Sequence, residues 1–532
     1  MTATLPEWIP FPEAYEDPAE LDRPRQPVPH ALRRWEDPRP WVAWLICAAL
    51  TIAAGFTRFW GLGFPNKKIF DEAYYPVEGQ ELLRFGYEDN RGYTFIVHPP
   101  LGKWLIGWSS DLFGNGLQDA FGWRVAPAFF GSLSVLLMFW IARRLFRSNL
   151  FGAIAGGLMV VEGMSLVLAR TAILDVFLQF FVLAAFGALV YDRDQMRARL
   201  ARLIEDGADL SQGVPSLGPR PWRLLAGVLF GLACATKWTA LSFFVLFWLL
   251  SLLWDRGAYK AAGVTRRFRA TVRRSWLPSL GSLGIVPIAT YLFCYTGWFV
   301  GENGWNRHWA DSHGTVGHLH VLGMSIPLWW GWVPGPIRSL GQYTYEAYTF
   351  HESLSSPHAY GSGPWSWLVL GRPVDFYYNG NGHDCGASAC SREVLLIGTP
   401  LLWWAFVPML LWLAWHYIST RDWRAAAVWV AFLAGWGVWF QDLKRTKFLF
   451  YMAPLIPFLI FGLTLALGVL LGPGLRRSAE QVGVKRRRWG IAGVSVYLGL
   501  VVVDFAWMWS ILTGTVTSYD VWHAHMWLPS WV

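Results

Sequence analysis

Long apolar runs separated by short charged segments recur along the whole chain. Runs of roughly 17–25 apolar residues match the thickness of a bilayer when they form α-helices. The predicted spans number eleven, at about 41–62, 122–143, 149–166, 170–191, 222–236, 238–254, 276–298, 397–418, 425–440, 448–471 and 490–513. The fifth span is short, so the region 222–254 can also be divided differently. The pattern predicts an all-α polytopic membrane protein.

The composition supports this prediction, because 54% of the 532 residues are hydrophobic and only 15% are charged. A soluble globule of this size could not bury so much apolar surface. The net charge of +9 does not indicate a nucleic-acid partner, since Lys and Arg mark the cytoplasmic loops of multispan proteins. Residues 1–40 are Pro-rich and polar, so we expect them to be largely disordered, without a cleavable signal peptide.

The basic residues also orient the spans. Alternate connecting segments, beginning with residues 1–40, hold 29 Lys and Arg in 123 residues, whereas the other set holds 14 in about 190. The first set is therefore predicted to be cytoplasmic. This gives a cytoplasmic N-terminus at 1–40, a transmembrane domain at 41–513 and an external tail at 514–532. The domain carries two long external loops, 63–121 and 299–396.

Both external loops hold a local structural signal. In the first, apolar residues fall at helical spacing and predict an amphipathic helix in the membrane interface: Leu101, Trp104, Leu105, Trp108 and Leu112. A helix packed on the core of the loop itself is the alternative. In the second loop, Cys385 and Cys390 lie in an oxidising compartment and can form a small disulfide. No cysteine or histidine set has zinc spacing.

Two adjacent carboxylates, Asp71 and Glu72, follow the first span at the place where water meets membrane. They can cap a short helix, which is the structural interpretation. Charged residues beside spans nevertheless suggest function, because they are costly there. Six map to the external half of the spans: Arg58, Arg124, Glu162, Arg170, Asp175 and Lys237. A transporter would carry polar residues near the midplane on broken helices, so their gathering at one face favours an enzyme.

The short external loop 441–447 carries three cations against the positive-inside rule: Lys444, Arg445 and Lys447. A cationic cluster at the outer leaflet suits a phosphate on a membrane lipid. Together with Arg58 and Arg124, this cluster is predicted to surround such a phosphate beside the carboxylates.

A sugar on a polyprenyl phosphate would suit this arrangement as a donor. Its leaving group is a stable anion that cations stabilise, so one carboxylate base is enough and direct displacement inverts the anomeric centre. We assign Asp71 as the base, and Glu72 as the group that orients the acceptor or the loop. A divalent metal held by Asp71, Glu72 and His98 is the competing hypothesis. Since the cations make a phosphate clamp possible without a metal, we predict no metal or other cofactor.

Short motifs follow one another in a specific order from Arg58 to about residue 470. They are Phe70-Asp71-Glu72, His98-Pro99-Pro100-Leu101-Gly102-Lys103, Gly122-Trp123-Arg124, Ala169-Arg170-Thr171-Ala172-Ile173-Leu174-Asp175, Thr236-Lys237-Trp238, His358-Ala359-Tyr360-Gly361-Ser362, Pro364-Trp365-Ser366-Trp367 and Arg372-Pro373-Val374. This series resembles the bacterial (actinobacterial) protein O-mannosyltransferases of the GT-C class. The resemblance implies a GT-C-type bundle of about eleven helices with interfacial helices in its two external loops.

The resemblance also implies an activity: transfer of mannose from polyprenyl-phosphate mannose to Ser or Thr of secreted proteins, outside a bacterial plasma membrane. Asp71 matches the catalytic acidic position of the family and Glu72 its neighbour, while Arg58 and Arg124 match arginines needed near the donor. The remaining motif positions are further candidates: His98, Lys103, Arg170, Asp175, Lys237, His358, Tyr360 and Arg372. Eukaryotic relatives carry a β-trefoil domain in the second loop, which about 98 residues cannot accommodate. We therefore expect the acceptor to arrive directly from the secretion translocon.

Two other functions are compatible with parts of the pattern. A polyprenyl-phosphate sugar transferase that acts on a cell-envelope lipid or glycan would use the same clamp, and only the motifs of the second loop argue against it. A transporter for a lipid-linked sugar would need midplane charges and related halves, which the sequence does not show.

Overall fold

Helices occupy all eleven predicted span positions in the structure, a computed structural model that describes residues 28–33, 35, 39–89, 97–321, 324–382, 385–441, 443–472 and 484–532. Nine of the described helices are long and apolar enough to cross a membrane. They are α2 (Pro40–Phe59), α5 (Ala120–Phe146), α8 (Asp175–Glu205), α10 (Ala240–Ala261), the helix Arg267–Cys294, α16 (Pro400–Thr420), α17 with η8 (Trp423–Phe440), η9 with α18 (Leu449–Leu470), and Arg486–Thr513, which is nearly all of α19 (Val484–Thr513). The predicted all-α polytopic fold is confirmed.

The third and fifth predicted spans are the exceptions in length. The third is a bent pair, α6 (Asn149–Val160) and α7 (Gly163–Ala169), which meet at 63°. At the bend, the Glu162 carboxylate accepts the backbone N–H groups of Met164 and Ser165 and so begins α7. The fifth is α9 (Pro221–Cys234), a helix of 14 residues. Because α9 ends there and α10 begins at Ala240, the predicted division of this region is confirmed.

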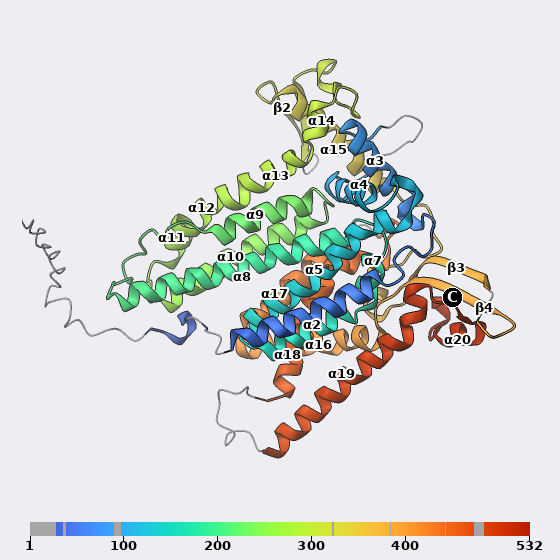
Figure 1. Ribbon diagram of the computed structural model, residues 1–532. Helices are drawn as coiled ribbons and strands as arrows, with labels where there is room; N and C mark the ends of the chain where they lie inside the picture. The colour runs from blue at the N-terminus through green and yellow to red at the C-terminus, as the bar shows by residue number, and fades with distance from the viewer. Residues whose placement is uncertain are drawn as a thin grey trace, which may run out of the picture. The chain divides into compact units, whose positions relative to one another are not determined.

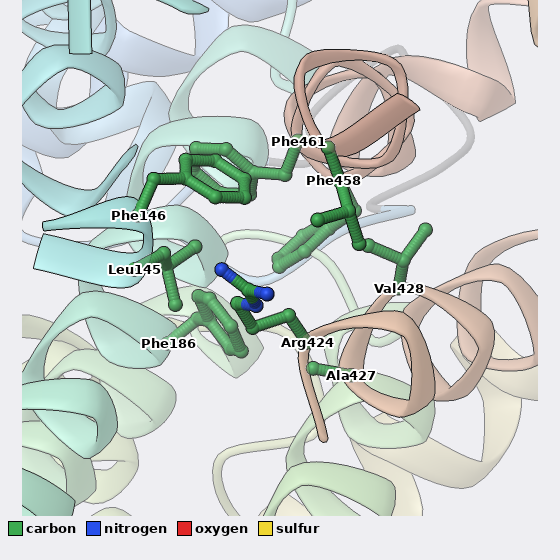
Figure 2. Close-up of a pocket in the computed structure, with 9 residues that line it drawn as sticks. Leu145, Phe146, Phe186, Arg424, Ala427, Val428, Phe458 and Phe461 are labelled. Atoms are coloured by element: carbon green, nitrogen blue, oxygen red, sulfur yellow. The ribbon is translucent and has the colours of Figure 1, made fainter. Parts of the chain in front are cut away.

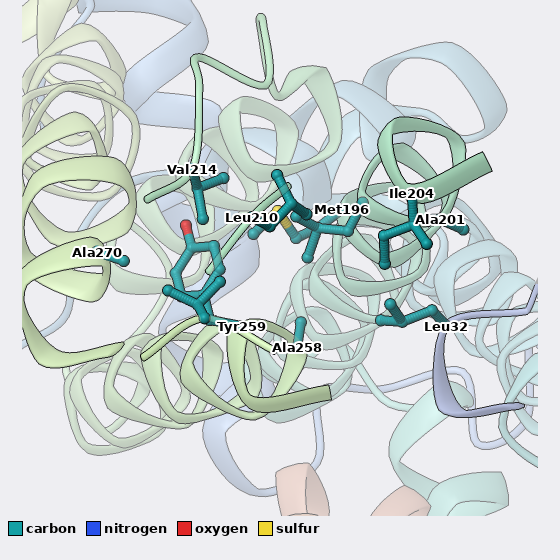
Figure 3. Packing of buried hydrophobic residues seen from close by; sticks show 11 residues of the cluster. Leu32, Met196, Ala201, Ile204, Leu210, Val214, Ala258, Tyr259 and Ala270 are labelled. Atoms are coloured by element: carbon teal, nitrogen blue, oxygen red, sulfur yellow. The ribbon is translucent and has the colours of Figure 1, made fainter. Parts of the chain in front are cut away.

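The described residues form two compact units. The smaller one consists of residues near 28–35 together with 193–219 and 252–278, which the sequence predicts to lie mostly in cytoplasmic loops. Figure 3 shows its apolar core, in which Tyr259 is buried and its hydroxyl lies 3.1 Å from Ser275 Oγ. Leu32 is also buried in this core, although the sequence predicts disorder around it. Residues 1–27 of the predicted disordered stretch lie outside the described residues.

The larger unit contains most of the helical bundle. Within it, α5 packs against α2, α6 and α7, and α18 packs against α16, α17 and α6 (Figure 1). The N-terminal end of α5 and the bend between α6 and α7 lie toward the external loops, where most of the predicted site residues are.

The first external loop folds into η2 (Phe70–Ala73), α3 (Tyr75–Phe85), α4 (Leu101–Phe113) and η3 (Gly116–Gln118). The backbones of α3 and α4 touch, since a Cβ added to Gly107 would lie 2.4 Å from the carbonyl oxygen of Gly79. Helix α4 is the predicted amphipathic helix. It exposes Trp108 and Leu112 and buries Lys103, as a helix does when its apolar side faces lipid.

The second external loop contains strands that the sequence analysis did not predict. Its elements are α14 (Thr296–Val300), η6 (Trp309–Asp311), β1 (Val316–Val321), β2 (Met324–Trp329), α15 (Gly335–Ser353), η7 (Pro364–Val369), β3 (Val374–Gly382) and β4 (Cys390–Leu396). Strands β1 and β2 form an antiparallel hairpin, and β3, β4 and β5 (Thr517–Ser518) form an antiparallel sheet in that order. The expected Cys385–Cys390 disulfide is present.

The chain after α19 packs against this sheet. It forms β5, α20 (Tyr519–Ala524) and η11 (Pro529–Trp531), and α20 lies beside β4 (Figure 1). Trp522 of α20 donates its indole N–H to the buried Glu393 of β4, at 2.6 Å. The predicted external tail is thus joined to the second external loop.

Candidate active site

Asp71 lies in η2, next to a residue with unusual backbone geometry. The φ of Phe70 is 48°, in the left-handed region that non-glycine residues seldom adopt. The Phe70 ring is held by four other rings, those of Phe376, Phe448, Phe450 and His358, with centroids 4.8–6.2 Å away. Such strain persists only where the surroundings over-determine it. This aromatic cluster therefore fixes the backbone that presents Asp71.

The Asp71 carboxylate is a partly accessible acid in a mostly apolar setting. Its Oδ2 accepts a hydrogen bond from the hydroxyl of Tyr75, at 3.4 Å. Burial raises the pKa of Asp71 to about 6, although the charge of Lys237 and the Tyr75 hydrogen bond oppose the shift. An acid with this pKa is mostly ionised at neutral pH and is a stronger base than an exposed aspartate.

Glu72, its neighbour, is turned away into the protein. Both of its oxygens bind the guanidinium of Arg124 at 2.7 Å, and both residues are fully buried. The carboxylate also accepts the backbone N–H groups of Ile69 and Ala172, at 3.1 and 2.9 Å. Arg124 gives its remaining donors to the backbone carbonyls of the first loop: Leu62, Pro65 and Lys67. Since an arginine has five N–H donors, none is left for a phosphate.

Arg58 and Arg170 are anchors of the same kind. Arg58 is fully buried and binds the carbonyl oxygens of Met159 and Val160 at the C-terminal end of α6. Arg170 binds the carbonyls that end α2 and follow it, at Thr57, Arg58, Trp60 and Gly61. A cation is stabilised at a helix C-terminus by the free carbonyl groups and the helix dipole. The geometry therefore does not place Arg58, Arg124 or Arg170 as direct ligands of a donor phosphate.

Lys237 is a further cation whose charge acts on Asp71, and it forms an ion pair with Asp175. The Lys237 ammonium lies 3.0 Å from both carboxylate oxygens of Asp175, and both side chains are buried. Its Nζ also lies 4.9 Å from the centre of the Tyr451 ring. Lys237 is the charge that most opposes the upward shift in the pKa of Asp71. An ammonium has three donors, and Asp175 uses two of them.

Two histidines stack beside this cation. The rings of His98 and His351 lie 4.6 Å apart at 26°, although 253 positions separate them in the sequence. His351 Nε2 contacts the carbonyl oxygen of Val97, and Arg445 NH2 lies 3.4 Å from His351 Nδ1. Burial lowers the pKa of His351 to about 4 and also lowers that of His98, an effect that Lys237 and Arg445 reinforce. Both rings are therefore neutral at pH 7.

Lys103 belongs to a separate buried cluster. Its ammonium lies 3.0 Å from Glu78 and 2.7 Å from Glu88, and Glu88 also accepts the hydroxyl of Tyr343 at 3.4 Å. Burial alone would lower the pKa of Lys103, but the two carboxylates raise it above its usual value. These contacts join α4 to α3 and α15, which indicates a structural role.

The predicted motif of the second loop reaches Asp71 through Phe70. The exposed His358 contacts the rings of Phe70 and Phe448, and the Tyr360 hydroxyl donates to Asp375 at 3.3 Å. Arg372 donates from Nε to the carbonyl of Ala359, at 3.1 Å. The motif therefore forms one side of the aromatic cluster around Phe70.

The basic loop 441–447 pairs with the same part of the second loop. The backbone of Lys447 accepts the N–H of Ser362 at 2.8 Å, and Thr446 donates to Leu354 at 2.9 Å. Of its three cations, Lys444 is exposed, Lys447 is buried, and Arg445 reaches His351. Asp442 lies outside the described residues. The sequence predicted the cations of this loop near Asp71 together with Arg58 and Arg124. In the structure, Lys237 is the cation whose charge acts on Asp71, and Arg445 contacts His351.

The predicted metal alternative does not match this geometry. Both oxygens of Glu72 are already bound to Arg124 and backbone N–H groups, so Glu72 is not free to join Asp71 and His98. Across the described parts of the chain, no three His, Cys, Asp or Glu side chains are grouped to hold a metal ion. That no metal takes part stays a prediction.

Three residues near Asp71 were missed by the sequence analysis: Tyr75, His351 and Tyr451. The position of Tyr75, four residues after Asp71, is a signal that could have been used, because such residues share a helical face. His351 and Tyr451 carry no comparable signal, since tertiary contacts alone bring them here. The resulting site has one base of raised pKa, two cations and two neutral imidazoles, which suits proton removal beside a developing anion.

Sequence and structure comparisons agree on one group of proteins. The family described as dolichyl-phosphate-mannose-protein mannosyltransferase matches residues 48–299, and the C-terminal four-transmembrane region of protein O-mannosyltransferases matches residues 337–531. The chain is 42% identical to the polyprenol-phosphate-mannose–protein mannosyltransferase of Mycobacterium tuberculosis (strain CDC 1551 / Oshkosh) over 499 residues, which cover 92% of each chain. It is 41% identical to the protein of the same name from Mycolicibacterium smegmatis (strain MKD8), over 92% of this chain and 93% of that one.

A solved structure shares the fold. The Saccharomyces cerevisiae protein O-mannosyltransferase Pmt1-Pmt2 complex bound to the sugar donor contains a chain that superposes with a TM-score of 0.70. The alignment covers 92% of this chain and 93% of that chain, at 16% sequence identity. At this identity, the likeness concerns the fold.

Proposed function

This chain belongs to the dolichyl-phosphate-mannose–protein mannosyltransferase family, and we propose that it transfers mannose from polyprenyl-phosphate mannose to Ser or Thr hydroxyls of proteins, with Asp71 as the base. It is a multi-pass membrane glycosyltransferase with a GT-C-type fold. The donor and the protein acceptor are those named for its relatives. The residue roles rest on the geometry around Asp71.

The observation that carries the mechanism is the electrostatic setting of Asp71. The carboxylate has a raised pKa of about 6 and is partly accessible, and Lys237 is the charge that most opposes the rise in its pKa. Arg445 contacts His351, whose ring stacks on that of His98. Asp71 can therefore accept a proton from the acceptor hydroxyl while Lys237 and Arg445 act on the phosphate of the donor.

The reaction is a single displacement. The acceptor hydroxyl oxygen forms a bond to C1 of mannose while the bond from C1 to the phosphate oxygen breaks, and that oxygen keeps the electron pair. The hydroxyl proton passes to the Asp71 carboxylate. Lys237 and Arg445 stabilise the charge that grows on the phosphate, so no general acid is needed. Because the nucleophile enters opposite the leaving group, the anomeric centre is inverted.

Several other predicted site residues position the loop that carries Asp71 and do not contact the reacting groups in this proposal. The Glu72–Arg124 pair and the Arg58 and Arg170 anchors hold the first loop on the ends of α2, α5 and α6. We assign them as positioning residues instead of phosphate ligands. His98 is neutral and can donate or accept a hydrogen bond at the rim of the phosphate site without adding charge. Both ring nitrogens of His351 are already in contact, with Val97 and Arg445, so His351 positions these groups.

Location and partners follow from the distribution of basic residues. We propose that Asp71 lies on the external side of a bacterial plasma membrane and that the acceptor is a secreted protein, delivered in extended form by the translocon. A cytoplasmic acceptor would have to cross to the opposite end of the helices.

The test is transfer by the purified protein from polyprenyl-phosphate [¹⁴C]mannose to a Ser/Thr-rich peptide. We expect label in the peptide as α- or β-mannoside of inverted configuration relative to the donor, and at least 100-fold slower turnover in Asp71→Asn, with donor binding retained. Label that enters only lipid or glycan would instead identify the enzyme as a lipid or glycan transferase. Near-normal turnover of Asp71→Asn would remove Asp71 from the role of base.

A further inference from the structure

A second polar site lies at the opposite end of the bundle from Asp71. The helices α5, α17 and α18 run from the neighbourhood of the active site to a cavity of about 330 Å³. On α5, Arg124 and Phe146 are 22 residues apart, which is roughly 33 Å along a helix. The basic residues predict that this distant end is cytoplasmic. The cavity therefore belongs to the other membrane face and is separate from the mannosyl-transfer site.

The walls of this cavity combine apolar side chains with two arginines. Phe146, Phe151, Leu465 and Val469 line its apolar part, and Arg424 and Arg486 are its charged residues. Glycine makes room here, because a Cβ on Gly468 would come within 3.1 Å of the Phe151 ring. The apolar surface continues onto the exposed side chains of Val469 and Leu470 at the end of α18.

Arg424 extends from this cavity into a smaller apolar one. Figure 2 shows its side chain among Leu145, Phe146 and Phe186, with Phe458 and Phe461 beyond. Asp422 holds the guanidinium from one side, through Nε at 3.0 and 3.1 Å and through NH2 at 2.5 Å. NH1 takes part in none of these bonds. The guanidinium is thus oriented by Asp422, and Arg424 lines both cavities.

We propose that this cavity binds one anionic phospholipid of the cytoplasmic leaflet, with the phosphate against Arg424 and Arg486 and an acyl chain along α18. Basic pockets between transmembrane helices on the cytoplasmic side are suited to anionic headgroups. The planar arginine group matches the geometry of a phosphate. A free phosphate would leave the aromatic and aliphatic wall hydrated, whereas an acyl chain covers it.

A lipid here would join the end of α5 to α17, α18 and α19, because Phe146, Arg424, Leu465 and Arg486 come from those four helices. Its effect would be on the bundle and not on the chemistry at Asp71. An experiment can therefore refute the proposed lipid site without refuting the proposed mannosyl transfer, and the reverse.

The experiment measures the lipids that stay with the full-length protein. The protein is equilibrated in nanodiscs with equal amounts of palmitoyl-oleoyl phosphatidylglycerol and phosphatidylcholine, released into detergent, and weighed by native mass spectrometry. We expect one phosphatidylglycerol to be retained at least fivefold over phosphatidylcholine. The double variant Arg424→Gln/Arg486→Gln should lose this preference. Arg488→Gln should keep this preference, because Arg488 is an exposed residue of α19, as Arg486 is, but does not line the cavity.

A second variant tests the cavity without replacing Arg424, whose loss could also disturb its contact with Asp422. Val469→Trp fills the cavity from an exposed position and leaves both arginines in place, so it should reduce retention of both lipids. Equal retention of the two lipids by the wild-type protein would overturn the proposal. Displacement of phosphatidylglycerol by an equimolar polyprenyl phosphate would also overturn it, by showing that the cavity serves the donor lipid.

Discussion

Glu72 and Arg124 form a buried ion pair in which both N–O distances are 2.7 Å. The two residues are 52 positions apart, and the pair joins the turn that carries Asp71 to the start of α5. The two neighbouring carboxylates thus have different partners. Asp71 stays partly accessible, whereas both oxygens of Glu72 are bound by Arg124 and backbone N–H groups.

The first prediction follows from this division. Glu72→Gln removes the charge that Arg124 needs, and breaking a buried pair from one side costs about 3–5 kcal/mol of unfolding free energy. We therefore expect Glu72→Gln to lower the thermal midpoint clearly and activity with it. Asp71→Asn should leave the midpoint unchanged or raised at pH 7, because it removes a carboxylate whose ionised form is disfavoured by burial. Thermal unfolding in detergent, followed by tryptophan fluorescence, compares the two variants. Equal midpoints would show that Glu72 does not anchor the turn.

The second prediction concerns the acid limb of the pH–rate profile. The base must be ionised, and the pKa of Asp71 is raised to about 6, so kcat/KM should fall about tenfold per pH unit below 6 and level off above it. The groups that set this value are Tyr75 and Lys237, which lower the pKa, and Asp175 and Glu78, which raise it. Tyr75→Phe removes a hydrogen bond to the carboxylate, so its limb should move to higher pH.

Tyr360→Phe is the matched control for that shift. It removes a tyrosine hydroxyl that binds Asp375 instead of Asp71. Its acid limb should stay where the wild-type limb is. If Tyr75→Phe also leaves the limb in place, another group is the titrating base.

The third prediction separates the cations of the loop 441–447. Arg445 reaches His351 beside the proposed phosphate site, while Lys444 is exposed. A hydrogen bond to a charged group is worth about 1.5–3 kcal/mol, which corresponds to roughly 10- to 100-fold in rate or affinity. We expect Arg445→Gln to lower kcat/KM for the donor by about that factor. Lys444→Gln, the control in the same loop, should change it less than threefold. Steady-state kinetics at varied donor concentration gives both values, and equal effects would mean that general charge attraction dominates.

Much of the bundle could be predicted from the sequence, because each span is an apolar run whose length matches a bilayer. The bend at Glu162 could not, since a carboxylate that caps α7 leaves the apolar pattern of the run intact. The strands of the second loop were also missed. The irregular pairing of β3 and β4 weakens the alternation that predicts a strand.

For the site, the sequence predicted Asp71 and the basic loop, but it could not show which cations already have partners. Whether the N–H donors of an arginine are already used depends on the carbonyl groups around it. Those groups come from segments far apart in the chain. Arg124 has three such carbonyl contacts in the first loop, and Arg58 has two at the end of α6. The ammonium group of Lys237, in contrast, donates to the carboxylate of Asp175, a pairing that the sequence does not reveal.

The fourth prediction connects the tail of the chain to the site. Arg372 donates to the Ala359 carbonyl in the second-loop motif and to the Val532 carbonyl in the tail, at 3.1 and 3.0 Å. The Trp531 indole and the Ser530 hydroxyl bind the carbonyls of Leu370 and Gly371, at 2.7 and 2.6 Å. The tail thus holds the motif that contacts Phe70. We expect Arg372→Ala to lower kcat about tenfold with little change in donor KM, because the motif packs on the aromatic cluster that fixes the backbone at Asp71.

Removal of residues 529–532 should have the same effect, and the two changes together should cost less than the sum of their separate effects, since they break one shared set of contacts. Arg338→Ala is the control, because this arginine of the same external loop donates to the Gly314 carbonyl, at 3.4 Å, and not to the motif or the tail. Limited proteolysis after residue 353 gives a second readout, because a loosened motif should be cut faster in both variants. Fully additive effects on kcat, with unchanged proteolysis, would show that the tail and Arg372 act separately, and that the motif keeps its place by packing against Phe70 and Phe448 alone.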